Sequence, residues 1–181
     1  NTLYLTGWLF RNPEGVNKYR KDILEYFKPI KEIEEKIEKF LRPYANKKLV
    51  GVHIRQGDYR IFKDGKYFIE QARVGEILDE YMRENNINTE DTVFIITSDG
   101  KIDESHFQGL NYSISNMGPV EDLFLLARTS AVIGSDSSFE DFASCYADVP
   151  HVVLQKDAMD WEYYRGKNNF FYNKYSTLTH Y

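Results

Sequence analysis

Three short polar clusters in this sequence contain residue types that bind phosphates and nucleosides, and each follows a run of apolar residues. They are residues 55–58 (RQGD), 97–100 (TSDG) and 135–138 (SDSS). The guanidinium of Arg55 is a planar cationic fork that matches a diphosphate. The carboxylates of Asp58 and Asp99 accept hydrogen bonds from a base or a ribose, and serine hydroxyls at the start of a helix suit a phosphate. These residue types indicate a site for a phosphate-bearing ligand.

The apolar pattern predicts a scaffold that brings the three clusters together. Short β-branched runs predict strands, and segments with helical spacing predict helices between them. This alternation predicts an α/β fold, a Rossmann-like parallel sheet flanked by helices. The carboxyl ends of parallel strands share one edge of the sheet, so the clusters are expected to converge there. The expected strands are 49–54, 92–97, 110–115, 131–134 and 151–154, and the expected helices are 16–27, 29–41, 70–84, 121–129 and 139–147.

Composition narrows the class of protein. At 181 residues the chain suits one domain, or one domain with a small appendage. The net charge of −5 argues against nucleic acid as a partner, and the one cysteine, Cys145, excludes an internal disulfide. No apolar run reaches the roughly 20 residues that a transmembrane helix needs. No metal site is predicted, because the histidines form no ligand pair with helical spacing; they are His53, His106, His151 and His180.

Each cluster also has a purely structural interpretation. Residues 55–58 suit an ordinary turn after a strand, and a histidine within a strand, such as His53, is often a packed core residue. Ser137 or Ser138 suits the N-cap of the following helix, with Glu140 or Asp141 in the first turn. The residue types alone leave both interpretations open.

An ordered set of motifs adds a resemblance to a known family. Residues 50–59 (VGVHIRQGDY) resemble the HxRRxD-type first motif of fucosyltransferases that use GDP-fucose, and are most similar to the α-1,2-fucosyltransferase family, where the motif reads HIRRGDY. Residues 94–99 (FIITSD) are similar to its second strand, which ends in a Ser/Thr-Asp pair. The third family block resembles residues 121–144, and residues 3–10 (LYLTGWLF) resemble the segment before the donor domain.

The resemblance implies a GT-B glycosyltransferase with two Rossmann-like lobes, of which this chain is the C-terminal, donor-binding lobe. The implied reaction is inverting and metal-independent, uses no cofactor, and transfers fucose from GDP-fucose to a hydroxyl of a glycan acceptor, with an α-1,2 linkage. Arg55 would bind the diphosphate and stabilise the leaving GDP. Asp58 is the second candidate catalytic residue, as a general base or as a residue that turns the loop after Arg55. The implied donor-binding residues are His53, Arg55, Gly57, Ser98, Asp99, Ser137, Ser138 and Phe139.

Two positions depart from the family pattern. Gln56 stands where the family often has a second arginine, so one positive charge of the donor site is missing. Residues 140–142 (EDF) stand where α-1,2-fucosyltransferases often have a pair of tryptophans. Both departures bear on the linkage and on the identity of the donor.

Three segments are expected along the chain. Residues 1–48 form an N-terminal helical segment that packs on the donor lobe or links to it, residues 49–156 form the donor domain, and residues 157–181 form an aromatic-rich cover. The start at Asn1, without Met, suggests a fragment that lacks most of the acceptor lobe. A non-catalytic domain of the same fold, binding carbohydrate or a protein through residues 161–175, is the alternative. The family implies a bacterial cytoplasmic enzyme of surface-glycan synthesis, with membrane association and a Golgi-lumen origin both left open.

Overall fold

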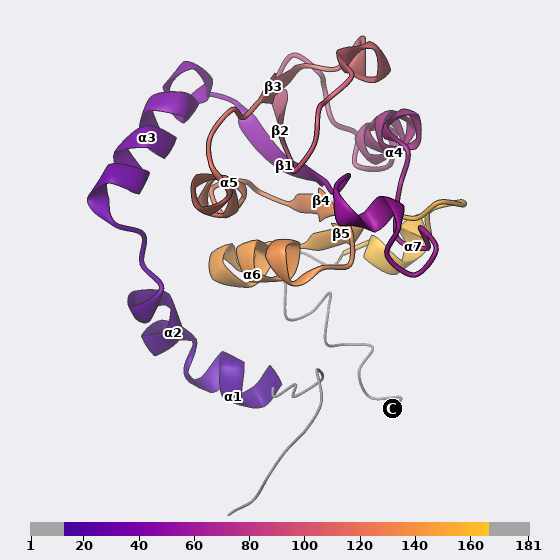
Figure 1. Ribbon diagram of the computed structural model, residues 1–181. Helices are drawn as coiled ribbons and strands as arrows, with labels where there is room; N and C mark the ends of the chain where they lie inside the picture. Colours follow the sequence, from indigo (N-terminus) through magenta and orange to yellow (C-terminus); the bar gives the residue numbers. More distant parts are fainter. Residues whose placement is uncertain (1–12, 167–181) are drawn as a thin grey trace, which may run out of the picture.

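The computed structural model describes residues 13–166, and its centre is a five-stranded parallel sheet in the order β3-β2-β1-β4-β5. The longest strands, β1 (Lys48–Ile54) and β2 (Thr92–Ser98), pair along seven residues. On the outer sides lie β3 (Tyr112–Ile114), β4 (Val132–Gly134) and β5 (His151–Val153). All pairs are parallel, so all strands end at the same edge (Figure 1). The predicted α/β fold is confirmed.

Helices cover both faces of this sheet (Figure 1). On one face, α4 (Gln71–Glu84) and α7 (Trp161–Tyr164) pack over the apolar side chains of the central strands. On the other face lie α3 (Lys31–Leu41), α5 (Pro119–Leu126) and α6 (Ser138–Ala147). Most strand side chains are buried, as expected for a parallel sheet covered on both faces, whereas those of the edge strand β3 are half-buried. This core fixes the positions of the strand ends.

The N-terminal segment differs from the single helix expected over residues 16–27. It forms two short helices, α1 (Pro13–Lys18) and α2 (Arg20–Tyr26), with a break at Tyr19. No residue of α2 is buried, so little tertiary packing supports a longer helix here. Arg20 nevertheless ties α2 to the lobe, because its Nη2 donates to the carbonyls of Cys145 (3.3 Å) and Tyr146 (2.9 Å) near the end of α6.

Short 3₁₀ helices complete the fold. They are η1 (Arg42–Tyr44), η2 (Asp58–Arg60) and η3 (Glu104–Phe107). The last lies in a segment expected to be loop, where the side chain of Asp103 accepts a hydrogen bond from the N–H of Ser105 and starts the turn. Sequence periodicity does not detect elements this short.

The beginning of the predicted aromatic cover packs on the sheet layer. Trp161 Nε1 donates to Glu80 on α4 at 2.9 Å, and the Tyr164 hydroxyl accepts from the N–H of Val153 at 3.1 Å. Tyr163 lies in the same short helix, whereas the aromatic residues of the predicted cover after Gly166, and the segment 3–10, lie outside the described residues. Within residues 13–166, no helix has the length and apolar character required to cross a membrane.

Candidate functional site

The carboxyl edge of the sheet brings the predicted clusters to one place, where a pocket of about 720 Å³ opens. This volume lies within the usual range for small-molecule sites. Four of the predicted residues line the pocket: Arg55, Ser137, Ser138 and Phe139. The other lining residues include three aromatic side chains from the loop after β1, and Asp136 and Phe142 from the other wall.

Arg55 is held in place by two carboxylates. Its Nε and Nη2 lie 3.1 and 3.0 Å from Asp58 Oδ1, and its Nε lies 3.2 Å from Asp99 Oδ2. Its guanidinium also lies over the ring of Tyr59, 5.2 Å from the centroid. Burial disfavours the charge, but the hydrogen bond and charge of Asp58 and the charge of Asp99 outweigh it and raise the pKa of Arg55. Within residues 13–166, its Nη1 makes no hydrogen bond or ion pair, so donors remain for an anion in the pocket.

Asp99 organises the loop that carries Arg55. Its Oδ1 accepts hydrogen bonds from the backbone N–H groups of Gln56 (2.6 Å) and Gly57 (3.1 Å). Burial opposes the negative charge, but these two hydrogen bonds and the charge of Arg55 lower the pKa of Asp99. A Cβ at position 57 would lie 2.9 Å from Asp99 Oδ2, so a larger residue here would displace this carboxylate. Asp99 and Gly57 therefore form the support behind Arg55 and do not line the pocket.

Ser98 also has a structural role in this arrangement. Its hydroxyl donates to the carbonyl of Ile54 at 2.7 Å and accepts from the N–H of Gly100 at 3.1 Å. These contacts join the end of β2 to the end of β1. Of the two candidate catalytic residues, Arg55 thus faces the pocket and Asp58 lies beside it, bonded to the guanidinium.

His53 is buried beneath the pocket wall. The residue is 4% exposed, its Nδ1 lies 2.8 Å from Glu140 Oε1, and its ring packs against Phe139 with centroids 4.6 Å apart. An ionised carboxylate only accepts hydrogen bonds, so Nδ1 carries the proton in this contact. The pocket-lining residues do not include His53. It reaches the site through Phe139.

Glu140 is the residue that sequence reasoning missed. It is 0% exposed, and its Oε1 accepts from the N–H of Ser135 (3.1 Å) and the Ser135 hydroxyl (2.7 Å) as well as from His53. Its Oε2 accepts from the hydroxyl of Ser137. Burial opposes the charge, but His53, Ser137 and Ser135 together lower the pKa of Glu140. The carboxylate therefore already occupies several donors that the phosphate-binding interpretation assigned to a ligand.

A capping-box pattern was the available signal for Glu140. Ser137 is the N-cap of α6 and its hydroxyl accepts from the N–H of Phe139 at 3.3 Å, which confirms the capping interpretation of this cluster. Glu140 lies three residues after the cap, as in a capping box. Its side chain turns inward here, beside Gly134, where a Cβ would lie 2.6 Å from Glu140 Cγ. Ser138 lines the pocket at the N-terminus of α6, where the helix dipole favours an anion.

Gln56 points away from the pocket. Its side-chain Oε1 accepts from Arg60 Nη2 at 3.1 Å, and its Nε2 donates to the carbonyl of Ile69 at 3.3 Å. The residue is buried at the base of the loop that follows β1. The position at which the family often has a second arginine therefore supports this loop.

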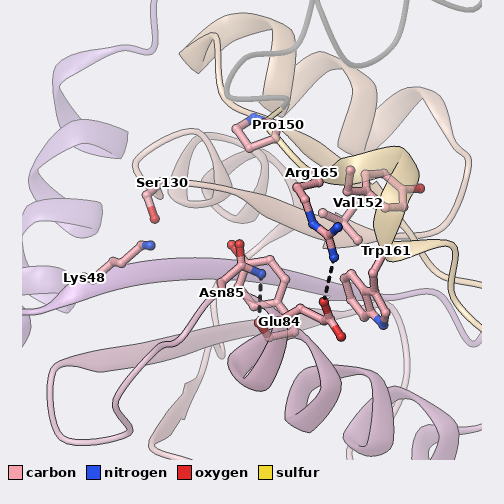
Figure 2. Close-up of a pocket in the computed structure, with 11 residues that line it drawn as sticks. Lys48, Glu84, Asn85, Ser130, Pro150, Val152, Trp161 and Arg165 are labelled. Carbon is pink, nitrogen blue, oxygen red and sulfur yellow. Dashed lines mark hydrogen bonds and ion pairs between the residues drawn. The ribbon is translucent and has the colours of Figure 1, made fainter.

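A second pocket, of about 330 Å³, lies at the opposite edge of the sheet (Figure 2). Lys48 at the start of β1 lines it, together with Asn85 at the end of α4. Arg165 also lines it but is paired with Glu84 (3.7 Å) and Glu162 (2.5 Å). The C-terminal end of a helix carries partial negative charge, which disfavours a phosphate. This pocket is a poorer anion site than the pocket at Arg55.

The described part of the chain contains no group of three or more His, Cys, Asp or Glu side chains arranged to hold a metal ion. Arg55 and Lys63 are the cationic side chains among the residues that line the pocket at the carboxyl edge.

Comparisons with known proteins place the fold. No protein-family model matches the sequence, and no curated protein matches it. Among solved structures, POFUT1 in complex with GDP-fucose matches with a TM-score of 0.57 and 13% identity, over 70% of this chain and 47% of that chain. The apo form of POFUT1 matches at 0.51 and 15%, over 68% and 46%. The fucosyltransferase NodZ from Bradyrhizobium matches at 0.47 and 14%, over 77% and 62%.

The matches to POFUT1 concern the fold. The domain is an α/β domain with a five-stranded parallel sheet flanked by helices, and it resembles part of the GT-B fucosyltransferases. The chain spans about half the length of the POFUT1 chain that it matches. At these identities the similarity concerns the fold, so the activity is argued from the site.

Proposed function

We propose that this domain is the donor-binding lobe of a GDP-fucose-dependent glycosyltransferase. The observation that carries the proposal is the position of Arg55. Its guanidinium lies at the carboxyl edge of a parallel sheet, lines a pocket of about 720 Å³, and is oriented by Asp58 and Asp99. This edge is where open α/β sheets bind nucleotides. The structural likeness to POFUT1 in complex with GDP-fucose supports the choice of donor.

In this proposal Arg55 binds the diphosphate and neutralises the charge that grows on the departing GDP. A preorganised cation at that position stabilises the transition state of glycosyl transfer without a metal ion. Ser138 and the N-terminus of α6 bind the second phosphate, on the opposite wall of the pocket. The reaction would invert the anomeric configuration and place fucose on a glycan hydroxyl, with α-1,2 as the proposed linkage.

The structure favours an orienting role for Asp58. A single oxygen, Oδ1, contacts both Nε and Nη2 of Arg55, which fixes the plane of the guanidinium. We therefore assign Asp58 to the positioning of Arg55. His53 and Glu140 support the opposite wall in the same way, since His53 packs beneath Phe139.

Calorimetric titration with GDP tests the proposal. The variant Arg55→Ala is expected to bind GDP at least about tenfold more weakly than the wild type, because charge-assisted contacts to the diphosphate are lost. Arg165→Ala, at the pocket on the opposite edge, is the matched control and should bind GDP with unchanged affinity. Absence of GDP binding by the wild type, or equal binding by the Arg55 variant, would overturn the proposal.

A further inference from the structure

The loop that follows β1 carries an aromatic cluster that the donor site does not account for. We name residues 58–68 the aromatic loop. The rings of Tyr59, Phe62 and Tyr67 contact one another, and each pair of centroids is 6.0 Å apart. All three line the pocket at the carboxyl edge, and Phe62 is 46% exposed. The cluster adjoins Arg55, whose guanidinium lies over the ring of Tyr59.

The aromatic loop is held in a defined conformation. Lys63, Asp64 and Gly65 have positive φ values of 47°, 56° and 71°, and successive turns are closed by hydrogen bonds from Gly65 to Phe62 (3.1 Å) and from Lys66 to Lys63 (3.1 Å). Lys156, beyond β5, donates to the carbonyl of Gly65 at 2.7 Å. Positive φ at non-glycine residues is unfavourable, so it persists only where surrounding contacts hold the chain. The three rings are therefore presented by a preorganised loop.

Gln56 and Arg60 anchor the base of this loop. Arg60 donates to Gln56 Oε1 at 3.1 Å, and its guanidinium lies over the ring of Phe68, 4.4 Å from the centroid. Gln56 in turn donates to the carbonyl of Ile69. The residue that replaces the second arginine of the family thus holds both ends of the aromatic loop.

The shape of the cluster indicates the chemical class of its ligand. The planes of Tyr59 and Phe62 are inclined by 18° and those of Phe62 and Tyr67 by 29°, whereas those of Tyr59 and Tyr67 are inclined by 47°, so the three rings form one contiguous aromatic cluster. Centroids 6.0 Å apart leave no slot between two rings for a planar base. A pyranose ring has an apolar face of C–H bonds and a rim of hydroxyls, which suits an aromatic surface with polar groups around it. The ammonium of Lys63 lies over the rings of Phe62 and Tyr67, 5.7 Å from each centroid, and that of Lys66 lies over Tyr67 at 5.5 Å, so donors for sugar hydroxyls lie at the cluster.

We propose that the aromatic loop binds a pyranose ring beside Arg55. The proposal rests on the proposed function, because a diphosphate bound at Arg55 would place the transferred sugar, and the acceptor that attacks it, beside the aromatic loop. The ring is thus either the fucose of the donor or a sugar of the acceptor glycan. Both have the same stacking chemistry, and the experiment below separates them.

The test compares the double variant Phe62→Ala/Tyr67→Ala with Ile61→Ala. Ile61 belongs to the same loop and is 82% exposed, but it does not line the pocket, so its variant is the matched control. Each protein is titrated with GDP and with GDP-fucose by calorimetry, and saturation-transfer NMR measures binding of lactose and of chitobiose. Urea unfolding shows whether each variant is folded.

The expected result has two supporting forms. If the bound pyranose is the fucose of the donor, the affinity of the double variant for GDP-fucose falls at least about fivefold, while its affinity for GDP stays within about twofold of that of the wild type. If the pyranose belongs to the acceptor, saturation transfer to lactose or chitobiose falls to background in the double variant and persists in the Ile61→Ala variant.

Other results overturn the proposal. The first is a wild type that binds GDP-fucose no differently from GDP and shows no saturation transfer to either saccharide. The second is a folded double variant whose affinity for GDP-fucose and saturation transfer to both saccharides equal those of the wild type. The third is an equal loss of affinity for GDP and GDP-fucose in the double variant, which would assign the aromatic rings to the base. Failure of the proposed function looks different, because the wild type would then not bind GDP at all. Loss of saccharide saturation transfer in the double variant would still support the sugar site in that case.

Discussion

Two polar clusters at the same edge of the sheet use their side chains in opposite ways. After β1, Arg55 is supported by Asp58 and Asp99 and keeps donors directed at the pocket. After β4, the serine hydroxyls are bonded to the buried carboxylate of Glu140. The first cluster is open to a ligand, whereas in the second the hydroxyls of Ser135 and Ser137 are bonded within the protein and Ser138 alone is assigned to the ligand. A polar run after a strand therefore does not by itself define a ligand site.

Two glycines account for much of the difference. Because Gly57 has no side chain, the carboxylate of Asp99 can approach the backbone N–H of Gly57. The carboxylate supports Arg55 from there without covering its guanidinium. Gly134 leaves the space that the Glu140 side chain fills from the helix side. The missing side chain of a glycine thus helps to keep the site after β1 open and lets Glu140 fill the space after β4. The predictions below test this difference, in order of decreasing effect.

The largest effect is expected at the closed cluster. Glu140→Ala removes the acceptor of His53 and of both groups of Ser135 in a buried place. Breaking a buried charged network of this kind costs about 3–5 kcal/mol of unfolding free energy. Urea denaturation at neutral pH measures the loss, with Glu35→Ala, in an exposed pair with Lys31, as the control. Equal unfolding free energies of Glu140→Ala and the wild type would contradict the claim that the cluster after β4 is stabilised by its hydrogen bonds to Glu140.

The pH dependence of stability gives a second, smaller effect. The pKa of Glu140 is lowered from its ordinary value of 4.5, so the unfolded chain takes up the proton at a higher pH than the folded protein. The stabilisation is complete above about pH 4.5 and is lost as the pH falls through the folded pKa. We expect the difference in unfolding free energy between wild type and Glu140→Gln to shrink with acidification below that point. A difference that grows or stays constant during acidic urea titrations would refute this.

The smallest effect is expected at the open cluster. In Gly57→Ala the new Cβ displaces Asp99, whose Oδ2 would be 2.9 Å away, and loosens the support of Arg55. We expect the affinity for GDP to fall about threefold, as measured by calorimetry. In an Asp99→Ala background the same substitution should have no further effect, because the clash is gone. Independent, additive losses would show that Gly57 does not act through Asp99.

Much of the fold followed from the sequence, because parallel strands buried on both faces are nearly continuous apolar runs. The runs before Arg55 and before Ser135 are of this kind, and their strands lie where the apolar pattern placed them. The N-terminal helix was predicted too long, since periodicity does not reveal that α2 lacks a partner to bury against.

The site was predicted only in part, for a physical reason visible at two neighbouring residues. Successive side chains leave an extended chain in opposite directions, so Arg55 faces the pocket while Gln56 enters the base of the aromatic loop. The sequence therefore suggested a missing charge at a position that does not face the pocket. The inward turn of Glu140 depends on the space beside Gly134, six residues away, which a cap pattern does not encode.

The most direct test of the central claim is to locate GDP on the protein. Two-dimensional ¹H–¹⁵N NMR during a GDP titration reports which backbone amides change. If the donor binds at the open cluster, shifts will concentrate at residues 55–58 and 137–139, on the two walls of the carboxyl-edge pocket. Shifts confined to Lys48, Asn85 and Arg165 at the opposite edge, or no shifts at all, would contradict the account.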